Sequence, residues 1–363
     1  MTVRAVGLVT SDPVEAVRWH AAGDLRLDDV ELRLPLGPGM IEAEVSCTGI
    51  CGSDVAEFRH PFAIRPGRVH ALTGQQPPIT LGHEFSATVT DVGEDVTDVS
   101  PGDRVAADSC WRCGRCEACV SGHYNVCWFG GSIGLASDGA FAPLVRFPAY
   151  CAVPLPDEVS DEVGALLEPL AVGLHALDRG GARAGDRVVV IGYGPIGACT
   201  ALVGRALGIE ILVSEPHAGR RARAEDHGFL TYKPKGEVRD VARDVRGLTG
   251  SGADVVVDCS GAVPALEAAP EMTKRGGRIV IAGIPKQPVP VDAGRMVLFE
   301  RSLIATLGYA NDLPRVAAMI AAGNLSPEVM ITRRISLEDT PAEIARLAED
   351  PGDDVKVLVE VGA

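Results

Sequence analysis

Four cysteines stand close together in the first half of the chain, with two, two and seven residues between them, at Cys113, Cys116, Cys119 and Cys127. Glycines and an asparagine between them let the chain turn around one ion. Four thiolates satisfy the tetrahedral preference of zinc and leave no position open for a substrate. The pattern therefore predicts a structural zinc site in a lobe at residues 110–128. Cys110 extends the two-residue spacing toward the N-terminus, so the spacing alone leaves the register open.

Three further motifs carry single metal-ligand types. Cys51 lies in Gly-Ile-Cys-Gly-Ser-Asp, His83 and Glu84 lie in Leu-Gly-His-Glu, and Glu168 opens Glu-Pro-Leu. Each motif alone is unspecific, because a single histidine is more often a hydrogen-bonded interior residue and Glu-Pro often begins a helix. Together they form a mixed cysteine, histidine and carboxylate set that can leave one zinc position open for water or an alcohol. They predict a second, catalytic zinc site.

A glycine-rich motif, Gly-Tyr-Gly-Pro-Ile-Gly, follows the apolar run 188–191 and precedes a segment expected to be helical through Leu207. Strand before and helix after are the context of a dinucleotide-binding turn. The first glycine permits the tight turn, the second lets backbone amides approach the pyrophosphate, and the third lets the helix pack closely on the strand. The helix N-terminus adds partial positive charge. The motif consists of Gly192, Tyr193, Gly194, Pro195, Ile196 and Gly197.

The choice of dinucleotide depends on Glu215, which ends the next expected strand. An acidic side chain at this spacing accepts hydrogen bonds from the adenosine ribose and repels a 2′-phosphate, which favours NAD over NADP. Arg220 and Arg221 follow closely and weaken this preference, because arginines can accommodate that phosphate.

The elements that must position these residues fall into two kinds. Up to about Ala165 the sequence has short strands broken by Gly and Pro, such as 40–45 and 87–93, which indicates an irregular antiparallel barrel or sandwich. After Gly185 apolar strands alternate with helical segments, as in a parallel sheet covered on both faces. The expected strands there are Arg187 to Ile191, Ile211 to Ser214, Asp254 to Asp258 and Arg278 to Ala282. Strand-like sequence returns at 355–359.

Length and composition agree with two domains and exclude several functions. A chain of 363 residues is too long for one ordinary core. The net charge of −15 argues against nucleic acid as a partner. No apolar run is long enough to span a bilayer, and the N-terminus lacks the pattern of a secretory signal. Ten cysteines in an unexported chain are better explained by metal ligation or catalysis than by disulfides, so a cytoplasmic location is expected.

On these motifs the chain resembles the medium-chain zinc alcohol dehydrogenase superfamily over nearly its full length. Pro-Gly-Asp-Arg-Val at 101–105 and Glu-Pro-Leu-Ala-Val at 168–172 add to the resemblance. The chain is most similar to the 2,3-butanediol dehydrogenase branch, beside the sorbitol and threonine dehydrogenases, because of the long segment 58–78, the motif Gly-His-Glu-Phe and a late Gly-Tyr-x-Asn-Asp at 308–312.

The resemblance implies an α/β architecture in which a Rossmann domain with a doubly wound parallel sheet is inserted into a β-rich, GroES-like catalytic domain. The expected boundaries are 1–165 and 306–363 for the catalytic domain and 166–305 for the NAD-binding domain. It also implies a homodimer or homotetramer. Two zinc ions, one structural and one catalytic, and NAD are the expected cofactors.

Carried over by position, Cys51 and His83, with Glu168 or Glu84, would bind the catalytic zinc; which glutamate does so stays open. Ser53 would pass the substrate proton toward solvent, and Asp54 would orient the ligands. The resemblance also places further residues against NAD. These are Ile196, Glu215, Arg220, Ala282, Gly283, Leu307 and Tyr309.

The implied reaction is hydride transfer between nicotinamide and a secondary alcohol or its ketone. Zinc lowers the pKa of the alcohol, Ser53 relays the proton, and the hydride passes to the cofactor. Relatives often carry a histidine at the position of Ala56, so water or Glu57 is expected to continue the relay. Glu57 and Gly308 replace an aromatic residue and an arginine of the sorbitol dehydrogenase pocket, which disfavours sorbitol.

The substrate is expected to be a vicinal diol, a polyol or a cyclitol. Alternatives are an amino alcohol or aminocyclitol, recognised by Glu57 if that side chain faces the pocket rather than solvent, and reduction of a ketone in biosynthesis. A nucleotide-binding scaffold without catalysis is the non-enzyme alternative. Cys51 and His83 speak against it, because a scaffold needs no open metal position.

Overall fold

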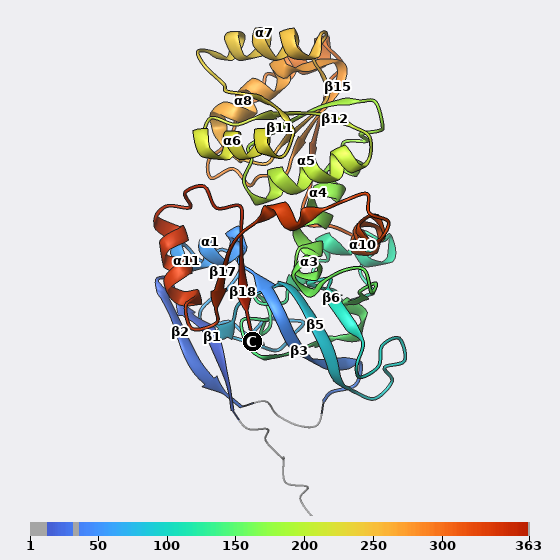
Figure 1. Ribbon diagram of the computed structural model, residues 1–363, viewed down its shortest axis with the longest axis vertical. Coiled ribbons are helices and arrows are strands. Elements are labelled where there is room, and N and C mark those ends of the chain that lie inside the picture. Colours follow the sequence, from blue (N-terminus) through green and yellow to red (C-terminus); the bar gives the residue numbers. More distant parts are fainter. Residues whose placement is uncertain (1–12, 32–35, 362–363) are drawn as a thin grey trace, which may run out of the picture. The chain divides into compact units, whose positions relative to one another are not determined.

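The computed structural model describes residues 13–31 and 36–361 (Figure 1). Residues 1–12, which the expectation about a secretory signal includes, lie outside this range. The chain divides into two compact units. The first contains the chain up to Glu168 together with Ile331–Gly352 and the segment from Lys356 onward, and the second contains Pro169–Met330 and Asp353–Val355. Within the described residues, no helix has the length and apolar composition needed to cross a bilayer.

The first unit is built on a seven-stranded, mainly antiparallel sheet with the order β10-β6-β5-β3-β18-β17, in which β9 also pairs with β3. A three-stranded sheet, β2-β1-β4, and a two-stranded sheet, β7-β8, complete it. The strands are β1 (Val14–Ala21), β2 (Asp24–Val30), β3 (Met40–Gly49), β4 (Ile79–Thr80), β5 (Glu84–Val92), β6 (Arg104–Ala107), β7 (Cys110–Trp111), β8 (Gly131–Ser132), β9 (Leu144–Pro148), β10 (Ala152–Pro154), β17 (Ile331–Ser336) and β18 (Lys356–Glu360). The helices are α1 (Gly52–Arg59), α2 (Glu117–Val120), η1 (Tyr124–Val126), η2 (Ala149–Cys151), α3 (Asp161–Ala165) and α11 (Thr340–Glu349).

Alternation of side chains explains the central strand of this sheet. In β3, Ile41, Ala43 and Val45 are buried, and Glu44 between them is exposed. Because successive side chains of a strand point to opposite faces, this pattern directs one face of the sheet into a core that also contains Phe85. The antiparallel pairing of β3 with β5, β9 and β18 confirms the antiparallel fold expected for this half of the chain.

The second unit has a six-stranded, all-parallel sheet with the order β13-β12-β11-β14-β15-β16. Helices α5 and α6 contact β12, and α8 contacts β14 and β15. The strands are β11 (Arg187–Ile191), β12 (Glu210–Ser214), β13 (Leu230–Tyr232), β14 (Ala253–Asp258), β15 (Thr273–Ile281) and β16 (Ser302–Ala305). The helices are α4 (Leu167–Arg179), α5 (Pro195–Ala206), α6 (Ala218–Asp226), α7 (Val238–Thr249), α8 (Val263–Met272), α9 (Ala293–Leu298), α10 (Leu313–Ala321) and η3 (Pro327–Met330).

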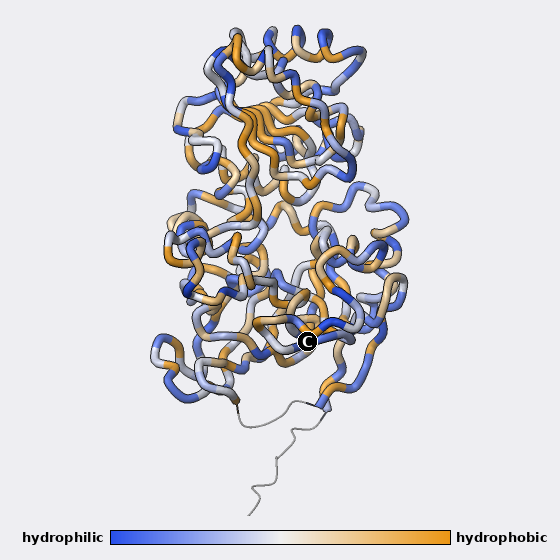
Figure 2. Tube along the Cα trace, turned by 180° about the vertical axis from the view of Figure 1, so that it is seen from behind, coloured by the Kyte–Doolittle hydropathy of each residue, from blue (hydrophilic) through white to orange (hydrophobic). Residues whose placement is uncertain are grey.

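The central strands of this sheet are apolar on both faces. In β11 four consecutive residues, 188–191, are buried, as a parallel strand covered on both faces requires. Figure 2 shows these strands as adjacent orange segments with blue segments around them. The continuous apolar runs of such strands explain why sequence alone places β11 at its observed residues and β12 and β14 to within one residue.

Some features differ from the expectations. β13 and β16, short strands at the two edges of the sheet, were not expected, because an edge strand lacks the apolar run of a central one. β15 begins at Thr273, well before the expected Arg278. The expected domain boundary after residue 305 also differs from the division of the chain, since α10 and η3 lie in the second unit.

One close helix contact depends on Gly173 in the middle of α4. A Cβ atom built at this position would lie 2.7 Å from the backbone nitrogen of Thr200 in α5. Such a contact is too short for any side chain, and the nearest atoms belong to the backbone, which cannot move aside easily. The two helices approach as closely as they do because this residue is glycine.

We therefore expect Gly173→Ala to lower the free energy of unfolding by about 1–3 kcal/mol through overpacking. The matched control is Gly247→Ala in α7, where a Cβ meets no atom within 4 Å. That change should raise stability by up to about 1 kcal/mol, because alanine favours the helix. Urea unfolding followed by circular dichroism compares the two variants. Equal effects would show that α4 and α5 do not constrain each other at this glycine.

Candidate active site and zinc lobe

The first unit brings Cys51, His83 and Glu84 together. One potential ligand atom from each lies within 4.8 Å of the others. The pairing of strands explains the meeting: in the ladder of β3 and β5, Gly49 lies opposite Glu84. Cys51 follows Gly49 by two residues, and His83 immediately precedes β5. Two motifs about thirty residues apart in the sequence therefore come together at the end of one pair of strands.

The ring of His83 is fixed from both sides. Its Nε2 lies 3.1 Å from the hydroxyl of Ser53, and its Nδ1 lies 3.5 Å from a carboxylate oxygen of Asp54. Asp54 is fully buried, and its other oxygen accepts the Cys51 N–H at 2.9 Å. One carboxylate thus orients both expected ligands, as carboxylates behind metal-bound histidines do.

Glu84 forms a buried ion pair with Lys356, the first residue of β18. Both side chains are almost inaccessible to solvent, and the Lys356 ammonium also donates to the carbonyl of Ile50 at 3.2 Å. β18 pairs with β3 so that Leu358 lies opposite Gly49, which brings Lys356 beside the motif that carries Cys51. An unpaired ion at this depth would cost several kcal/mol, so each member of the pair offsets the cost of burying the other.

Burial dominates the electrostatics of the group. It raises the pKa of the Cys51 thiol and that of the Asp54 carboxyl. Burial alone would lower the pKa of His83, but the negative charges of Asp54 and Cys51 raise it well above its usual value. Burial therefore disfavours the thiolate and the carboxylate here, and nearby negative charges favour the protonated imidazole.

The residues fit a zinc ion. Besides the thiol and the imidazole, they offer one carboxylate oxygen of Glu84, Oε1, which is buried and lacks a hydrogen-bond partner among the described residues. A sulfur, a nitrogen and an oxygen ligand that converge at one point are the mixed set expected for a catalytic zinc site. A cation bound there would also stabilise the thiolate and the carboxylates that burial disfavours.

Glu168, the other expected carboxylate ligand, lies at the start of α4 and is half-buried. It is not part of the three-residue group, although its charge contributes to raising the pKa of His83. The geometry therefore brings Glu84 closest to the cysteine and the histidine, and keeps Glu168 near enough to act on them electrostatically.

Glu57 has a structural role that sequence reasoning missed. Its side chain is fully buried in α1, so the hypothesis that it points to solvent is wrong. One carboxylate oxygen accepts backbone N–H groups of Phe62 at 3.1 Å, Ala63 at 2.5 Å and Ile64 at 3.4 Å, and the other accepts that of Ile64 at 3.3 Å. Both oxygens that could have recognised a substrate amine are thus directed to the loop after α1.

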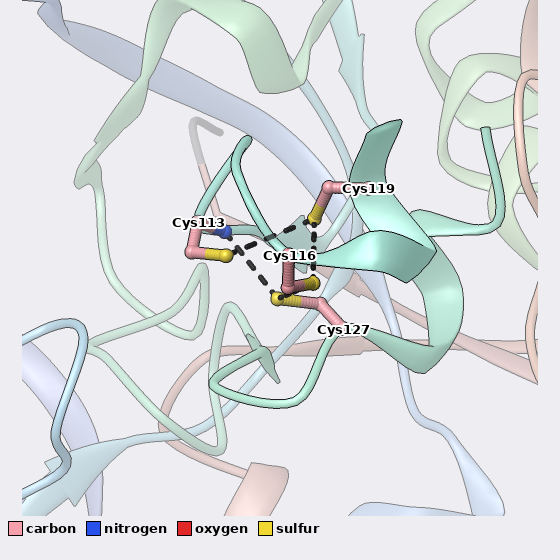
Figure 3. Close-up of side chains that lie close together, drawn as sticks. All are labelled: Cys113, Cys116, Cys119 and Cys127. Carbon is pink, nitrogen blue, oxygen red and sulfur yellow. Dashed lines mark hydrogen bonds between the residues drawn. The ribbon is translucent and has the colours of Figure 1, made fainter. Parts of the chain in front are cut away.

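The four expected cysteines of the lobe converge (Figure 3). Their sulfur atoms lie 3.5 Å (Cys116 and Cys119), 3.8 Å (Cys116 and Cys127) and 4.0 Å (Cys113 and Cys119) apart. Four thiolates bound to zinc at about 2.3 Å are separated by about 3.8 Å in a tetrahedron. Cys110 lies outside the group, in β7, which settles the register in favour of the Cys113 set.

Backbone groups prepare this lobe for a metal. The N–H groups of Cys119 and Trp128 lower the pKa of Cys116 to about 6, which favours its thiolate. Arg112 attaches the lobe to the rest of the unit. Its guanidinium lies 4.1 Å from the ring centre of Tyr124 and 4.5 Å from that of Tyr150.

In the second unit, expected cofactor residues lie at the carboxyl ends of the strands of the parallel sheet. In the register, Ile191 of β11 lies beside Ser214 of β12 and Asp258 of β14, and Asp258 lies beside Ile281 of β15. The next residues in each strand include Gly192, Glu215 and Ala282. Open α/β sheets bind dinucleotides at the carboxyl ends of their strands.

The glycine motif has the geometry of a dinucleotide turn. Gly192 has a φ of +90°, which side chains rarely adopt, and Gly194 is the N-cap of α5. A Cβ at Gly197 would overlap the Gly192 carbonyl. Pro195 and Ile196 form the first turn of α5, so backbone N–H groups at this helix end point outward for an anion.

Glu215 is buried and holds two backbone N–H groups. Its oxygens accept from Tyr193 and from His217, both at 2.7 Å. The carboxylate therefore ties the glycine motif to the end of β12. Arg221 donates to the carbonyl of Glu215 at 3.1 Å, whereas Arg220 lies near Gly194, since a Cβ built there would be 4.0 Å from its Nη1.

The remaining expected cofactor contacts occupy the continuation of β15 and β16. The N–H groups of Ala282 and Gly283 donate to the carbonyl of Asp258, and Gly283 packs directly against Gly261. Leu307 is exposed, and Tyr309 is buried. Ala282, Gly283 and Leu307 thus come after the carboxyl ends of β15 and β16, as the glycine motif comes after that of β11.

Fold and sites together define a class: a dehydrogenase with a dinucleotide-binding sheet and a separate unit carrying two metal-binding groups. Residues 37–157 match the family model of the alcohol dehydrogenase GroES-like domain, and residues 195–322 match that of the zinc-binding dehydrogenases.

Individual relatives agree. The chain is 33% identical to (R,R)-butanediol dehydrogenase of Bacillus subtilis over 352 residues, 95% of this chain and 99% of that one. The crystal structure of 2R,3R-butanediol dehydrogenase from Bacillus subtilis superposes with a TM-score of 0.89 over 96% of this chain and 99% of that one, at 33% identity. Human sorbitol dehydrogenase is 33% identical over 326 residues, 88% of each chain. A zinc-binding dehydrogenase of Sinorhizobium meliloti, solved with NADP, gives a TM-score of 0.85 at 31% identity, covering 96% of this chain and 100% of that one.

The chain therefore belongs to the zinc-dependent medium-chain alcohol dehydrogenase superfamily, in its butanediol and sorbitol dehydrogenase branch. It is an oxidoreductase that acts on CH–OH groups with zinc and a nicotinamide dinucleotide. The resemblance recognised from the motifs is confirmed.

Lys356 is the functional residue that sequence reasoning missed. Its signal was a lysine inside the apolar run Val355-Lys356-Val357-Leu358-Val359. A charged side chain within an apolar strand requires a buried partner, although the sequence does not show which residue that partner is.

We expect Lys356→Met to lower the free energy of unfolding by about 3–5 kcal/mol, because the charge of Glu84 would remain buried without its partner. The double variant Lys356→Met with Glu84→Gln should regain part of this loss. Lys274→Met, which breaks a half-exposed pair with Asp254, should cost less than about 1 kcal/mol. Urea unfolding measures all three. A similar loss for Lys274→Met would contradict the special cost of the buried pair.

Proposed function

We propose that this protein oxidises a vicinal diol or related polyol to the hydroxy ketone with NAD, at the group formed by Cys51, His83 and Glu84. The observation that carries the proposal is the convergence of these three ligand types on one point, with His83 and Glu84 buried and Cys51 half-buried, within the fold of the butanediol and sorbitol dehydrogenases. A diol is favoured because both types of relative are named for substrates with neighbouring hydroxyl groups.

Each residue of the site has a task in this reaction. When bound, zinc supplies the positive charge that makes an alcohol acidic, and NAD accepts the hydride. Cys51 and His83 hold the cation, with Glu84 or Glu168 as the oxygen ligand. Asp54 keeps the imidazole and the Cys51 backbone in place. Ser53, whose hydroxyl lies 3.1 Å from His83, takes the substrate proton and passes it to water, since Ala56 offers no imidazole.

An amino alcohol has less support. That alternative depended on Glu57 to recognise an ammonium group, and its carboxylate is bonded to three loop amides. A neutral diol does not need a free carboxylate for its recognition.

NAD is proposed as the preferred cofactor because the buried Glu215 carboxylate stands after β12, where a 2′-phosphate would meet its charge. Arg220 lies nearby, and the Sinorhizobium relative was solved with NADP. The preference is therefore tested by measuring activity with both cofactors. We expect wild type to have a higher kcat/KM with NAD than with NADP.

Glu215→Gln should reduce that preference by about tenfold or more, since one charge repulsion is removed. Glu210→Gln, at the opposite end of β12 and exposed, is the matched control and should leave the ratio unchanged. Initial rates measured with NAD and with NADP give the ratio of the two kcat/KM values for each variant. An unchanged ratio in Glu215→Gln would remove this residue from cofactor selection.

We further propose a homodimer or homotetramer in the cytoplasm. β16 is an edge strand whose Leu303 is exposed, and Val297 and Leu298 beside it are 80% and 77% exposed, a surface suited to pairing with another copy. Thiolate metal sites persist where thiols stay reduced. Light scattering after size exclusion tests the assembly.

The central test separates the two metal groups. Wild type should contain two zinc ions per subunit and oxidise 2,3-butanediol, whereas Cys51→Ser should contain about one and lose at least about a thousandfold in kcat. Cys199→Ala, a buried cysteine of α5 outside both groups, should keep both properties. Elemental analysis and NADH absorbance supply the readouts. Full activity in Cys51→Ser would overturn the proposed site.

A further inference from the structure

A cavity of about 520 Å³ in the first unit has the features of a site for an organic anion. It lies between the loop after α1 and the end of the zinc lobe. Arg65, Arg68 and His70 supply its polar side chains together with Gln75. Its apolar lining includes Ile64, Ile79, Leu135, Trp128 and Phe129. Its size is that of ordinary small-molecule sites.

The two arginines of this cavity lie three residues apart in one loop, and both are exposed. Neither guanidinium makes a hydrogen bond or ion pair with any residue in the described ranges, unlike those of Arg104 and Arg146, which are paired with carboxylates. Among the described residues that line the cavity there is no Asp or Glu. In a protein with a net charge of −15, two neighbouring cations without a counter-charge mark a local site for an anion.

His70 adds a further donor. Its Nδ1 accepts the Thr73 N–H at 3.3 Å, which leaves Nε2 to carry a ring proton. The aromatic side chains provide the other half of the site: Trp128 is 74% exposed and Phe129 is 48% exposed. A ligand with a flat or apolar part and an anionic group would cover these rings and reach the arginines.

The loop that carries the arginines is fixed before any ligand binds. Glu57 holds the N–H groups of residues 62–64 at its beginning. At its end, the His70 N–H donates to the Gln75 carbonyl at 2.7 Å, and the Gln75 side chain accepts the Asp138 N–H at 2.7 Å. Little backbone entropy is therefore lost on binding.

We propose that this cavity, the Arg65–Arg68 pocket, binds a small organic anion through the two guanidinium groups, with the apolar part of the ligand against Trp128 and Phe129. The proposal concerns binding rather than turnover, so it stands or falls independently of the proposed diol oxidation. Carboxylates and phosphates share the required chemistry, because both accept paired hydrogen bonds from arginine.

The probes are benzoate and its neutral counterpart benzamide, titrated into the zinc-loaded protein by calorimetry. Benzoate should bind saturably and benzamide at least about tenfold more weakly. Arg65→Gln with Arg68→Gln should weaken benzoate binding by about tenfold or more, since two charged donors are lost. Both arginines are exposed, and unchanged circular dichroism will confirm that the fold is intact.

Two control variants locate the binding. Arg239→Gln, an exposed arginine of α7, should bind benzoate as wild type does. Cys51→Ser should also do so, which separates this pocket from a carboxylate bound to the catalytic metal. Absence of saturable benzoate binding up to about 50 mM, or equal binding by the double arginine variant and wild type, would overturn the proposal.

A kinetic experiment shows whether the anionic group belongs to the alcohol substrate or to a separate ligand. If the group is carried by the alcohol substrate, benzoate should compete with the alcohol in wild type and lose that effect in the double arginine variant. If it belongs to a separate ligand, inhibition or activation should be independent of the alcohol concentration. Inhibition that persists in the double arginine variant would contradict binding at this pocket.

Discussion

The register of three neighbouring strands is the constraint on which the catalytic group depends. Glu84 of β5 lies opposite Gly49 of β3, and Gly49 lies opposite Leu358 of β18. A shift by one residue would turn every side chain of a strand to the other face. The cysteine, the histidine, the glutamate and the lysine meet only in the observed register. Gly49 is also needed at the centre, because a Cβ there would collide with the Glu84 carboxylate.

The two metal groups differ in what surrounds them, and the difference explains their different tasks. The four cysteines of the lobe are half-exposed, and backbone N–H groups stabilise the thiolate of Cys116. In the group around Cys51, His83 and Glu84 are buried, and burial raises the pKa of the Cys51 thiol. A cation held among these groups would be shielded from water, and its electrostatic effect on a bound alcohol would be larger than in solution. The lobe stabilises structure, whereas the buried group can do chemistry.

Much of this arrangement follows from local sequence. The four cysteines lie within fifteen residues, and the glycine motif lies between a strand and a helix, so short-range spacing is sufficient to predict both sites. The central strands of the parallel sheet can be predicted from sequence equally well, because buried strands have long apolar runs. What could not be predicted depends on contacts between distant residues or on weak local signals. Lys356 meets Glu84 across 272 positions, and β16 has too short a run to be distinguished from a loop.

Glu57 shows how a substitution in a family motif can be misjudged from sequence. A carboxylate at this position suggested either recognition of a hydroxyl or ammonium group of the substrate, or exposure to solvent, because acidic side chains are seldom buried unpaired. The structure satisfies it differently, with successive backbone N–H groups that curl around one oxygen. Backbone donors carry no sequence signature, so no reading of residue types could have revealed them.

This contact has a consequence for specificity. Glu57 lies in the helix that begins beside Cys51, and it fixes the loop that carries Arg65 and Arg68. Burial raises the pKa of Glu57, whereas the loop N–H groups lower it, so the charged form depends on the loop remaining in place. The same carboxylate therefore couples the helix of the catalytic group to the wall of the neighbouring cavity. Changes in that loop can alter which ligands bind while leaving the ligands of the metal in position.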